Sequence, residues 1–138
     1  MEKKTLHKTI KKQWFDMIVS GEKKEEYLEI KPFWVSRFIN TDRYPKEYPN
    51  DGKNIAEDIC YDIIELNQTD FEEIVKAYYS DVINLDTVTC RNGYTRFSPL
   101  VVWEHKGVTI GEGKPEWGAV PGVKYLILQI GEILDIKN

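Results

Sequence analysis

The sequence predicts a small α+β domain whose second half forms antiparallel β structure, as a curled sheet or a small barrel. Three observations predict this class. The length of 138 residues suits a single domain. Apolar residues at helical spacing dominate between residues 11 and 80. From Leu85 onward, short apolar runs separated by glycine-containing turns replace that spacing.

The N-terminal part predicts a strand followed by a helix. Residues 5–10 alternate in polarity, so Leu6 and Ile10 are expected to face inward. Residues 11–20 predict an amphipathic helix, with an apolar stripe formed by Trp14, Phe15, Met17, Ile18 and Val19. Gly21 predicts the end of this helix, because glycine enters the left-handed conformation at little cost.

A short extended segment and a second helix follow. Residues 25–30 predict a strand or an extended loop. Residues 32–39 predict a helix, since Pro32 is well tolerated in a first turn, and its expected buried side consists of Phe33, Trp34, Phe38 and Ile39. Residues 41–53 contain two prolines and the turn sequence Asn50-Asp51-Gly52, so they predict a loop.

An acidic helical pair is expected next, over residues 54–66 and 69–78. Apolar residues recur at helical spacing in both segments, and Thr69 followed by Glu72 predicts a capping box. We interpret residues 41–85 as an insertion in a single domain that spans residues 1–138. A long, partly disordered loop is the alternative, against which the apolar spacing argues.

Four strands are predicted in the last third, over residues 86–91, 99–105, 108–111 and 125–130. Asn92-Gly93 and Lys106-Gly107 predict tight turns between them. Residues 111–118 are rich in glycine and contain a proline, which predicts a loop.

Composition narrows the function classes. The net charge of −4 argues against the strongly basic footprint of a duplex-binding protein, although five lysines among the first 12 residues leave room for a local basic face. Two cysteines without a CxxC pair indicate no disulfide framework, and no ligand spacing predicts a metal site or a cofactor. Without a long apolar run or an apolar N-terminal segment, a cytoplasmic protein outside the membrane is expected.

The stretch from Gly21 to Glu29 is the first candidate site. Lys23 and Glu26 lie three residues apart, directly behind a predicted helix end. An ammonium and a carboxylate directed into one pocket could bind a polar ligand or move protons. The alternative is a charged turn that faces water, as most charge runs do.

Two downstream segments carry further candidates. A predicted turn combines a cation, an amide and an aromatic ring, which could contact phosphates or base edges and stack on rings, namely Arg91, Asn92 and Tyr94. The glycine-rich loop brings together groups that suit base stacking and edge recognition, namely Lys114, Glu116 and Trp117. A plain hairpin turn and a structural loop are the alternatives, and the spacing of the second segment is not that of a P-loop.

Three blocks occur in a fixed order along the chain: WFDMIVSGEKKEEYLEIKPFW, CRNGY and GVTIGEGKPEWGA. Together they resemble the ASCH (ASC-1 homology) domain family of the PUA-like superfamily. The family signature G-x-K-x-x-E-x-R matches at Gly21, Lys23 and Glu26, whereas Leu28 stands at the arginine position. The resemblance covers residues 3–40 and 86–134.

The resemblance implies a fold and a partner. The implied fold is a PUA-like small antiparallel β-barrel with flanking helices, and here an inserted acidic helical segment. The implied function is binding of RNA or a modified nucleoside, with a role in RNA metabolism, in a cleft where the GxKxxE loop meets the barrel. The residues expected around this cleft are Lys23, Glu26, Arg91, Asn92, Tyr94, Lys114, Glu116 and Trp117.

Two other functions are kept open. One branch of the family hydrolyses the acetyl amide of N4-acetylcytidine with a lysine, a threonine and a glutamate. Lys23 corresponds to that lysine, Glu26 stands at the threonine position, and Glu116 is a candidate for the glutamate, so a metal-free amidohydrolase is one alternative. Because Glu26 lies beside it, Lys23 is expected to favour its charged form. A protein-interaction module that uses the acidic helices is the other alternative.

Overall fold

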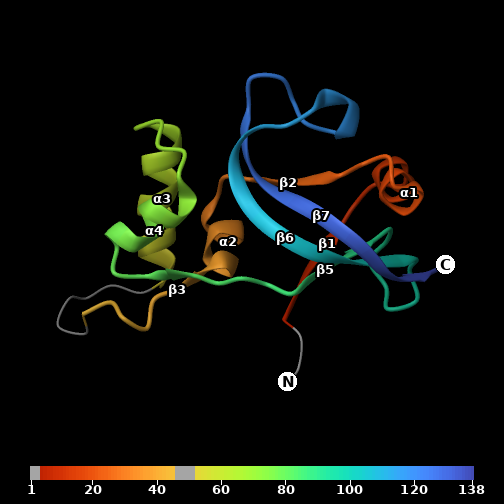
Figure 1. Cartoon of the computed structure of the whole chain (residues 1–138), viewed down its shortest axis with the longest axis horizontal. Helices are drawn as coiled ribbons and strands as arrows, with labels where there is room; N and C mark the ends of the chain where they lie inside the picture. Colours follow the sequence, from red (N-terminus) through yellow and green to blue (C-terminus); the bar gives the residue numbers. More distant parts are fainter. Residues whose placement is uncertain (1–3, 46–51) are drawn as a thin grey trace.

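A five-stranded mixed sheet forms the body of the molecule. The computed structural model describes residues 4–45 and 52–138 (Figure 1). The strands follow the order β1-β5-β6-β7-β2. The pair β1–β5 is parallel and the other three pairs are antiparallel. Their bounds are β1 Thr5–Thr9, β2 Glu25–Glu29, β5 Thr87–Arg91, β6 Leu100–Glu112 and β7 Lys124–Lys137. The expectation of an α+β protein with an antiparallel second half is confirmed.

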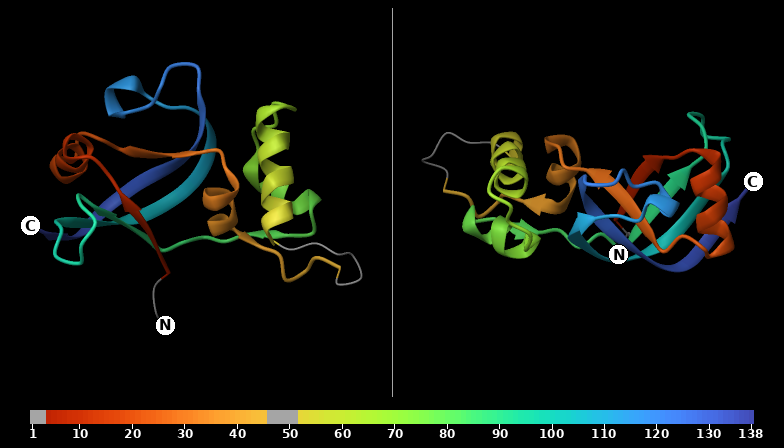
Figure 2. Two further views of the ribbon diagram at one scale, coloured as in Figure 1. Left: turned by 180° about the vertical axis from the view of Figure 1, so that it is seen from behind. Right: turned by 90° about the horizontal axis from the view of Figure 1, so that it is seen from above.

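Helices flank the sheet on two sides. Helix α1, Lys12–Ser20, lies at one end of the sheet, and helices α2, α3 and α4 lie at the opposite end (Figures 1 and 2). The remaining elements are α2 Pro32–Val35, the 3-10 turn η1 Ser36–Phe38, α3 Gly52–Ile64, α4 Phe71–Ala77, and the short antiparallel pair β3 Ile39–Asn40 and β4 Asp81–Val82.

The predicted end of α1 is confirmed. Gly21 has a φ of 85° and donates its backbone N–H to the carbonyl of Ile18. Phe15 and Ile18 are buried, as the apolar stripe predicts. Two residues beyond the glycine, the backbone N–H of Lys23 donates to the carbonyl of Met17. This turn directs the chain back across the sheet and into β2.

One hydrophobic core joins the sheet to the helical segment. Leu6 and Ile10 are buried in it, as expected. So are the central residues of the sheet and the apolar faces of α3 and α4, including Trp103, Ile59, Ile63, Phe71 and Val75. From residue 52 onward the acidic segment is therefore a packed helical unit, which rules out a disordered loop there. The turn expected at Asn50 and Asp51 lies outside the described residues.

Three local expectations are wrong. Lys106-Gly107 forms no turn, because β6 runs continuously from Leu100 to Glu112 and absorbs these residues as a register shift against β7. The cap of α4 is Asp70, whose carboxylate accepts from the N–H of Glu73, in place of Thr69. Phe33 is exposed, and its ring lies edge-on to Trp34.

The sheet is curled but not closed into a barrel (Figure 1). Strands β1 and β2 lie at the two ends of the strand order, and no backbone pairing joins them within residues 4–45 and 52–138. A side chain connects them, because Lys8 Nζ of β1 donates to the carbonyl of Tyr27 of β2 at 2.8 Å. The curled sheet predicted from the sequence is thus present, and the closed barrel is not.

In the described part of the chain, each helix is too short or too polar to cross a lipid bilayer.

Candidate functional site

A cavity of about 450 Å³ opens between the β1–α1 connection, β2 and η2, the 3-10 turn Pro115–Trp117. Aromatic side chains from five elements line it: Trp14 of α1, Tyr27 of β2, Trp34 of α2, Trp117 of η2 and Tyr125 of β7. Lys8, Lys11 and Lys31 add three ammonium groups to the same lining. Aromatic walls with a few polar groups are typical of small-molecule sites of this size.

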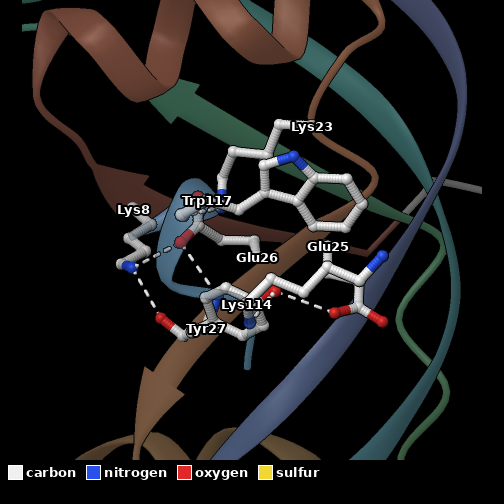
Figure 3. A network of polar contacts seen from close by, with 7 residues as sticks. All are labelled: Lys8, Lys23, Glu25, Glu26, Tyr27, Lys114 and Trp117. Atoms are coloured by element: carbon white, nitrogen blue, oxygen red, sulfur yellow. Dashed lines mark hydrogen bonds and ion pairs between the residues drawn. The ribbon is translucent and has the colours of Figure 1, made fainter. Parts of the chain in front are cut away.

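Lys23 lies behind this cavity and is only 1% exposed. Its Nζ donates to the carbonyl of Trp117 at 2.6 Å. The same nitrogen lies 4.7 Å from the centroid of the Tyr27 ring and 3.9 Å from Glu26 Oε2 (Figure 3). The turn after Gly21 places it there, so the charged stretch GEKKEE is not a uniformly solvated turn.

Glu26 lines the cavity and is 5% exposed. Its Oε1 accepts from Lys8 Nζ at 3.0 Å and from the backbone N–H of Tyr27 at 2.9 Å (Figure 3). Its Oε2 is buried and has no hydrogen-bond partner among the described residues. Lys23 Nζ at 3.9 Å gives this oxygen electrostatic compensation without a hydrogen bond. A buried carboxylate oxygen in this state can accept a hydrogen bond from a ligand.

Burial lowers the pKa of Lys23 below the ordinary value of 10.5, and the opposing influence of Glu26 does not reverse this. Glu26 favours the charged form of Lys23, as expected, but its influence on the pKa is smaller than that of burial. Desolvation of the ammonium exceeds its attraction to a carboxylate 3.9 Å away. The amine of Lys23 thus gives up its proton more readily than an exposed lysine does.

Tyr27 is held as a fixed, neutral wall of the cavity. Its hydroxyl donates to Glu25 Oε1 at 2.8 Å and accepts from the backbone N–H of Lys114 at 3.0 Å (Figure 3). Burial raises the pKa of this phenol. Gly113 packs against the ring so closely that a Cβ there would lie 2.6 Å from ring atoms, so the approach of the 111–118 loop requires glycine.

The structure brings three of the sequence-predicted site residues together. Lys23, Glu26 and Trp117 meet at the cavity through the contacts above. Lys114 is exposed, with its Nζ 4.3 Å from the centroid of the Trp117 ring, and it does not line the cavity. Glu116 is exposed and lies outside the lining as well.

The predicted platform at residues 91–94 lies outside the cavity lining. The guanidinium of Arg91 donates to the carbonyls of Arg96 and Ser98, so it supports its own loop. The backbone N–H of Asn92 donates to the carbonyl of Pro99. Tyr94 is 95% exposed. These contacts describe a hairpin loop whose rings face water.

Several cavity residues were not predicted from the sequence. The sequence predicts core positions for Trp14 and Trp34 and no site role for Lys8 and Tyr27, yet all four line the cavity. A signal for Lys8 did exist: in an alternating strand it shares a face with Leu6 and Ile10, so a lysine was directed at the interior. Its aliphatic stem can be buried while its ammonium reaches a buried partner.

Other places in the fold offer less chemistry. A second hollow of about 520 Å³ at the α3–α4 turn is lined by polar, acidic and aliphatic residues, and the described residues contribute no aromatic ring or cation to it. Burial raises the pKa of Cys60 to about 11 and of Cys90 to about 12, so both thiols stay protonated. Within the described ranges, no three His, Cys, Asp or Glu side chains gather as metal ligands do.

No family model matches this chain, and comparisons with curated proteins and with solved structures found no significant match. The function is therefore inferred from the site itself.

Proposed function

We propose that this protein binds a base of RNA, or a modified nucleoside, in the cavity bounded by β1, β2 and η2. One observation carries the proposal: aromatic rings from five elements line a cavity together with Glu26, a buried carboxylate with one oxygen that has no hydrogen-bond partner among the described residues. Unpaired bases are recognised by stacking on aromatic rings and by hydrogen bonds to their edges. Trp34 and Trp117 supply stacking faces, and Glu26 supplies the acceptor for an amino group.

Membership of the PUA-like superfamily, through the ASCH family, is part of the same proposal. The strongly curled sheet, the position of Glu26 in the cavity lining and that of Lys23 behind it support it. Two features depart from the family pattern. Lys8 bridges the open edge between β1 and β2 in place of strand pairing. Leu28 has no exposed surface and pairs with Leu126, so the arginine position of the signature is a core position in this chain.

Calorimetric titration with cytidine, adenosine and a short single-stranded RNA tests the proposal. We expect saturable binding, weakened about tenfold or more by Trp34→Ala, because stacking on one ring contributes about 1–3 kcal/mol per base. Phe97→Ala is the matched control, since Phe97 is 81% exposed and lies outside the cavity lining. Equal affinities for the two variants, or no binding of any of the three ligands, would contradict the proposal.

Hydrolysis of an N-acyl nucleoside such as N4-acetylcytidine is the second candidate, and the lowered pKa of Lys23 favours it. In this reaction the neutral amine takes a proton from water as the water oxygen adds to the acetyl carbonyl. The amide C–N bond then breaks and the proton passes to the departing N4 nitrogen, which yields acetate and cytidine. Since the side chain of Lys23 has no exposed surface, the segment around Trp117 has to move for the amine to reach a substrate.

Chromatography of N4-acetylcytidine incubated with the protein tests this second candidate. Turnover that is retained in Lys24→Met and lost in Lys23→Met supports it, because the exposed Lys24 is the adjacent lysine on the same turn. Turnover by Lys23→Met at the rate of the unchanged protein would exclude Lys23 as the base.

A further inference from the structure

The cavity has a cationic end that no residue of the GxKxxE segment supplies. Helix α1 begins there, with Lys11 as its N-cap residue. Its first turn contains no acidic residue, and no side chain in the described part of the chain caps it. Lys11 and Trp14, from the start of this helix, both line the cavity. An uncapped helix start therefore opens on the cavity that the proposed function assigns to a base.

The first backbone N–H groups of a helix have no partner within the helix, and the helix dipole adds positive potential at the same end. Together they favour anions, phosphate groups in particular. Two ammonium groups strengthen this end. Lys11 and Lys8 both line the cavity. Lys8 donates two of its three N–H groups to Glu26 Oε1 and to the carbonyl of Tyr27.

The same cavity also contains a group that needs a hydrogen-bond donor. Glu26 is only 5% exposed, and its Oε2 has no hydrogen-bond partner among the residues described. A buried acceptor left in this state is unfavourable, and a ligand N–H would satisfy it. A ligand that suits both ends of the cavity carries an anionic group and an N–H donor in one molecule.

We propose that the start of α1, with Lys11 and Lys8, is a phosphate subsite. The ligand is then a phosphorylated nucleotide unit whose base offers an exocyclic amino group to Glu26 Oε2. Cytosine and adenine have such a group, whereas uracil presents a carbonyl oxygen there, which a carboxylate repels. The cavity volume of about 450 Å³ lies within the usual range for small ligands. This inference rests on the proposed base-binding function and adds the phosphate to it.

Titration calorimetry at one fixed, low salt concentration tests the subsite with four probes: cytidine, cytidine 5′-monophosphate, uridine 5′-monophosphate, and a five-residue oligocytidylate without a terminal phosphate. We expect the cytidine monophosphate or the oligocytidylate to bind at least about tenfold more tightly than cytidine, the usual strength of charge-assisted phosphate contacts. A gain with the monophosphate identifies a terminal phosphate as the source. A gain with the oligocytidylate alone identifies an RNA phosphodiester.

Matched variants locate the two contacts. Lys11→Ala should abolish the gain from phosphate, while Lys12→Ala should retain it, because Lys12 belongs to the same helix start but is paired with Asp16. Glu26→Gln should remove the preference for the cytidine over the uridine nucleotide. Glu22→Gln should keep that preference, since Glu22 is an exposed carboxylate of the same segment and lies outside the cavity lining.

The outcomes separate this inference from the function beneath it. Cytidine that binds as tightly as its monophosphate and its oligomer would overturn the phosphate subsite and leave base binding intact. An equal loss in Lys11→Ala and Lys12→Ala would also overturn it, because general charge would then explain the gain. No binding of any probe would overturn the base-binding function, and the subsite with it.

Discussion

The sequence predicts three segments as ligand contacts, and the structure places two of them, the stretch from Gly21 to Glu29 and the turn at residues 91–94, in opposite environments. Residues 23–27 bury a lysine and a glutamate and leave one carboxylate oxygen without a hydrogen bond among the described residues. The loop of residues 92–99 forms hydrogen bonds within itself, among them one in which the Ser98 hydroxyl accepts from the N–H of Thr95, and it leaves Tyr94 and Phe97 exposed. Burying charged groups is unfavourable in free energy, whereas the side chains of an exposed turn contribute little to the free energy of folding. We therefore assign the ligand site to the first segment.

Removing the charge of Glu26 should have the largest effect on stability. Glu26→Gln removes the carboxylate that pairs with the buried Lys23 and the partly buried Lys8, and breaking a buried pair costs about 3–5 kcal/mol. Urea unfolding measures the change, with Phe97→Ala as the comparison from the exposed loop, where we expect a change within about 0.5 kcal/mol. Equal losses in the two variants would remove the energetic difference between the segments.

Ligand affinity should respond next. Trp117→Ala removes a cavity wall and should weaken cytidine binding about tenfold or more. Arg96→Ala, which removes a cation that lies over the Phe97 ring in the exposed loop, should leave the affinity unchanged. Calorimetry gives both values. If Arg96→Ala weakened binding as much as Trp117→Ala, residues 92–99 would have to be included among the ligand contacts.

The pH dependence of stability should reveal the buried lysine. The folded-state pKa of Lys23 is lowered, so between that pKa and 10.5 the unfolded chain binds more protons than the folded one. The free energy of unfolding should rise with pH in this window, by at most about 1.4 kcal/mol per pH unit. Urea unfolding at several pH values, compared with Lys23→Met, isolates the contribution. A difference between the two proteins that stays constant, or falls with pH, would contradict the direction of the shift.

The smallest effect is expected at Arg91. Its guanidinium donates to two carbonyls of its own loop, at 3.2 and 3.4 Å. Arg91→Met should therefore lower the free energy of unfolding by about 0.5–1.5 kcal/mol, the usual range for such hydrogen bonds. Cytidine affinity should not change. A loss of affinity without a loss of stability would identify Arg91 as a ligand contact.

The sequence predicted most of what depends on local patterns. The end of α1 at Gly21, the inward positions of Leu6 and Ile10, and the helical nature of the acidic segment follow from glycine conformation and apolar spacing. The sequence also predicts Lys23 and Glu26 as site residues, because they lie three residues apart directly behind a helix end and can reach one pocket. The burial of Lys23 and its contact with Trp117 depend on a turn 94 residues further along the chain.

What the sequence did not predict depends on long-range pairing. The Lys106-Gly107 dipeptide has turn residues, yet pairing with β7 on both sides holds β6 together as one bulged strand. Tyr94 is exposed because its loop projects into solvent, and local composition does not encode that position. Lys8 joins β1 to β2, two strands that no sequence pattern connects.

The indole N–H signals of the four tryptophans give the most direct test of the site. Trp14, Trp34 and Trp117 line the cavity, while Trp103 is fully buried in the core and serves as an internal reference. In ¹H–¹⁵N NMR spectra recorded during a titration with cytidine, the first three signals should shift in a saturable manner and that of Trp103 should not. Signals that all stay unchanged, or that all shift equally, would contradict a base-binding site in this cavity.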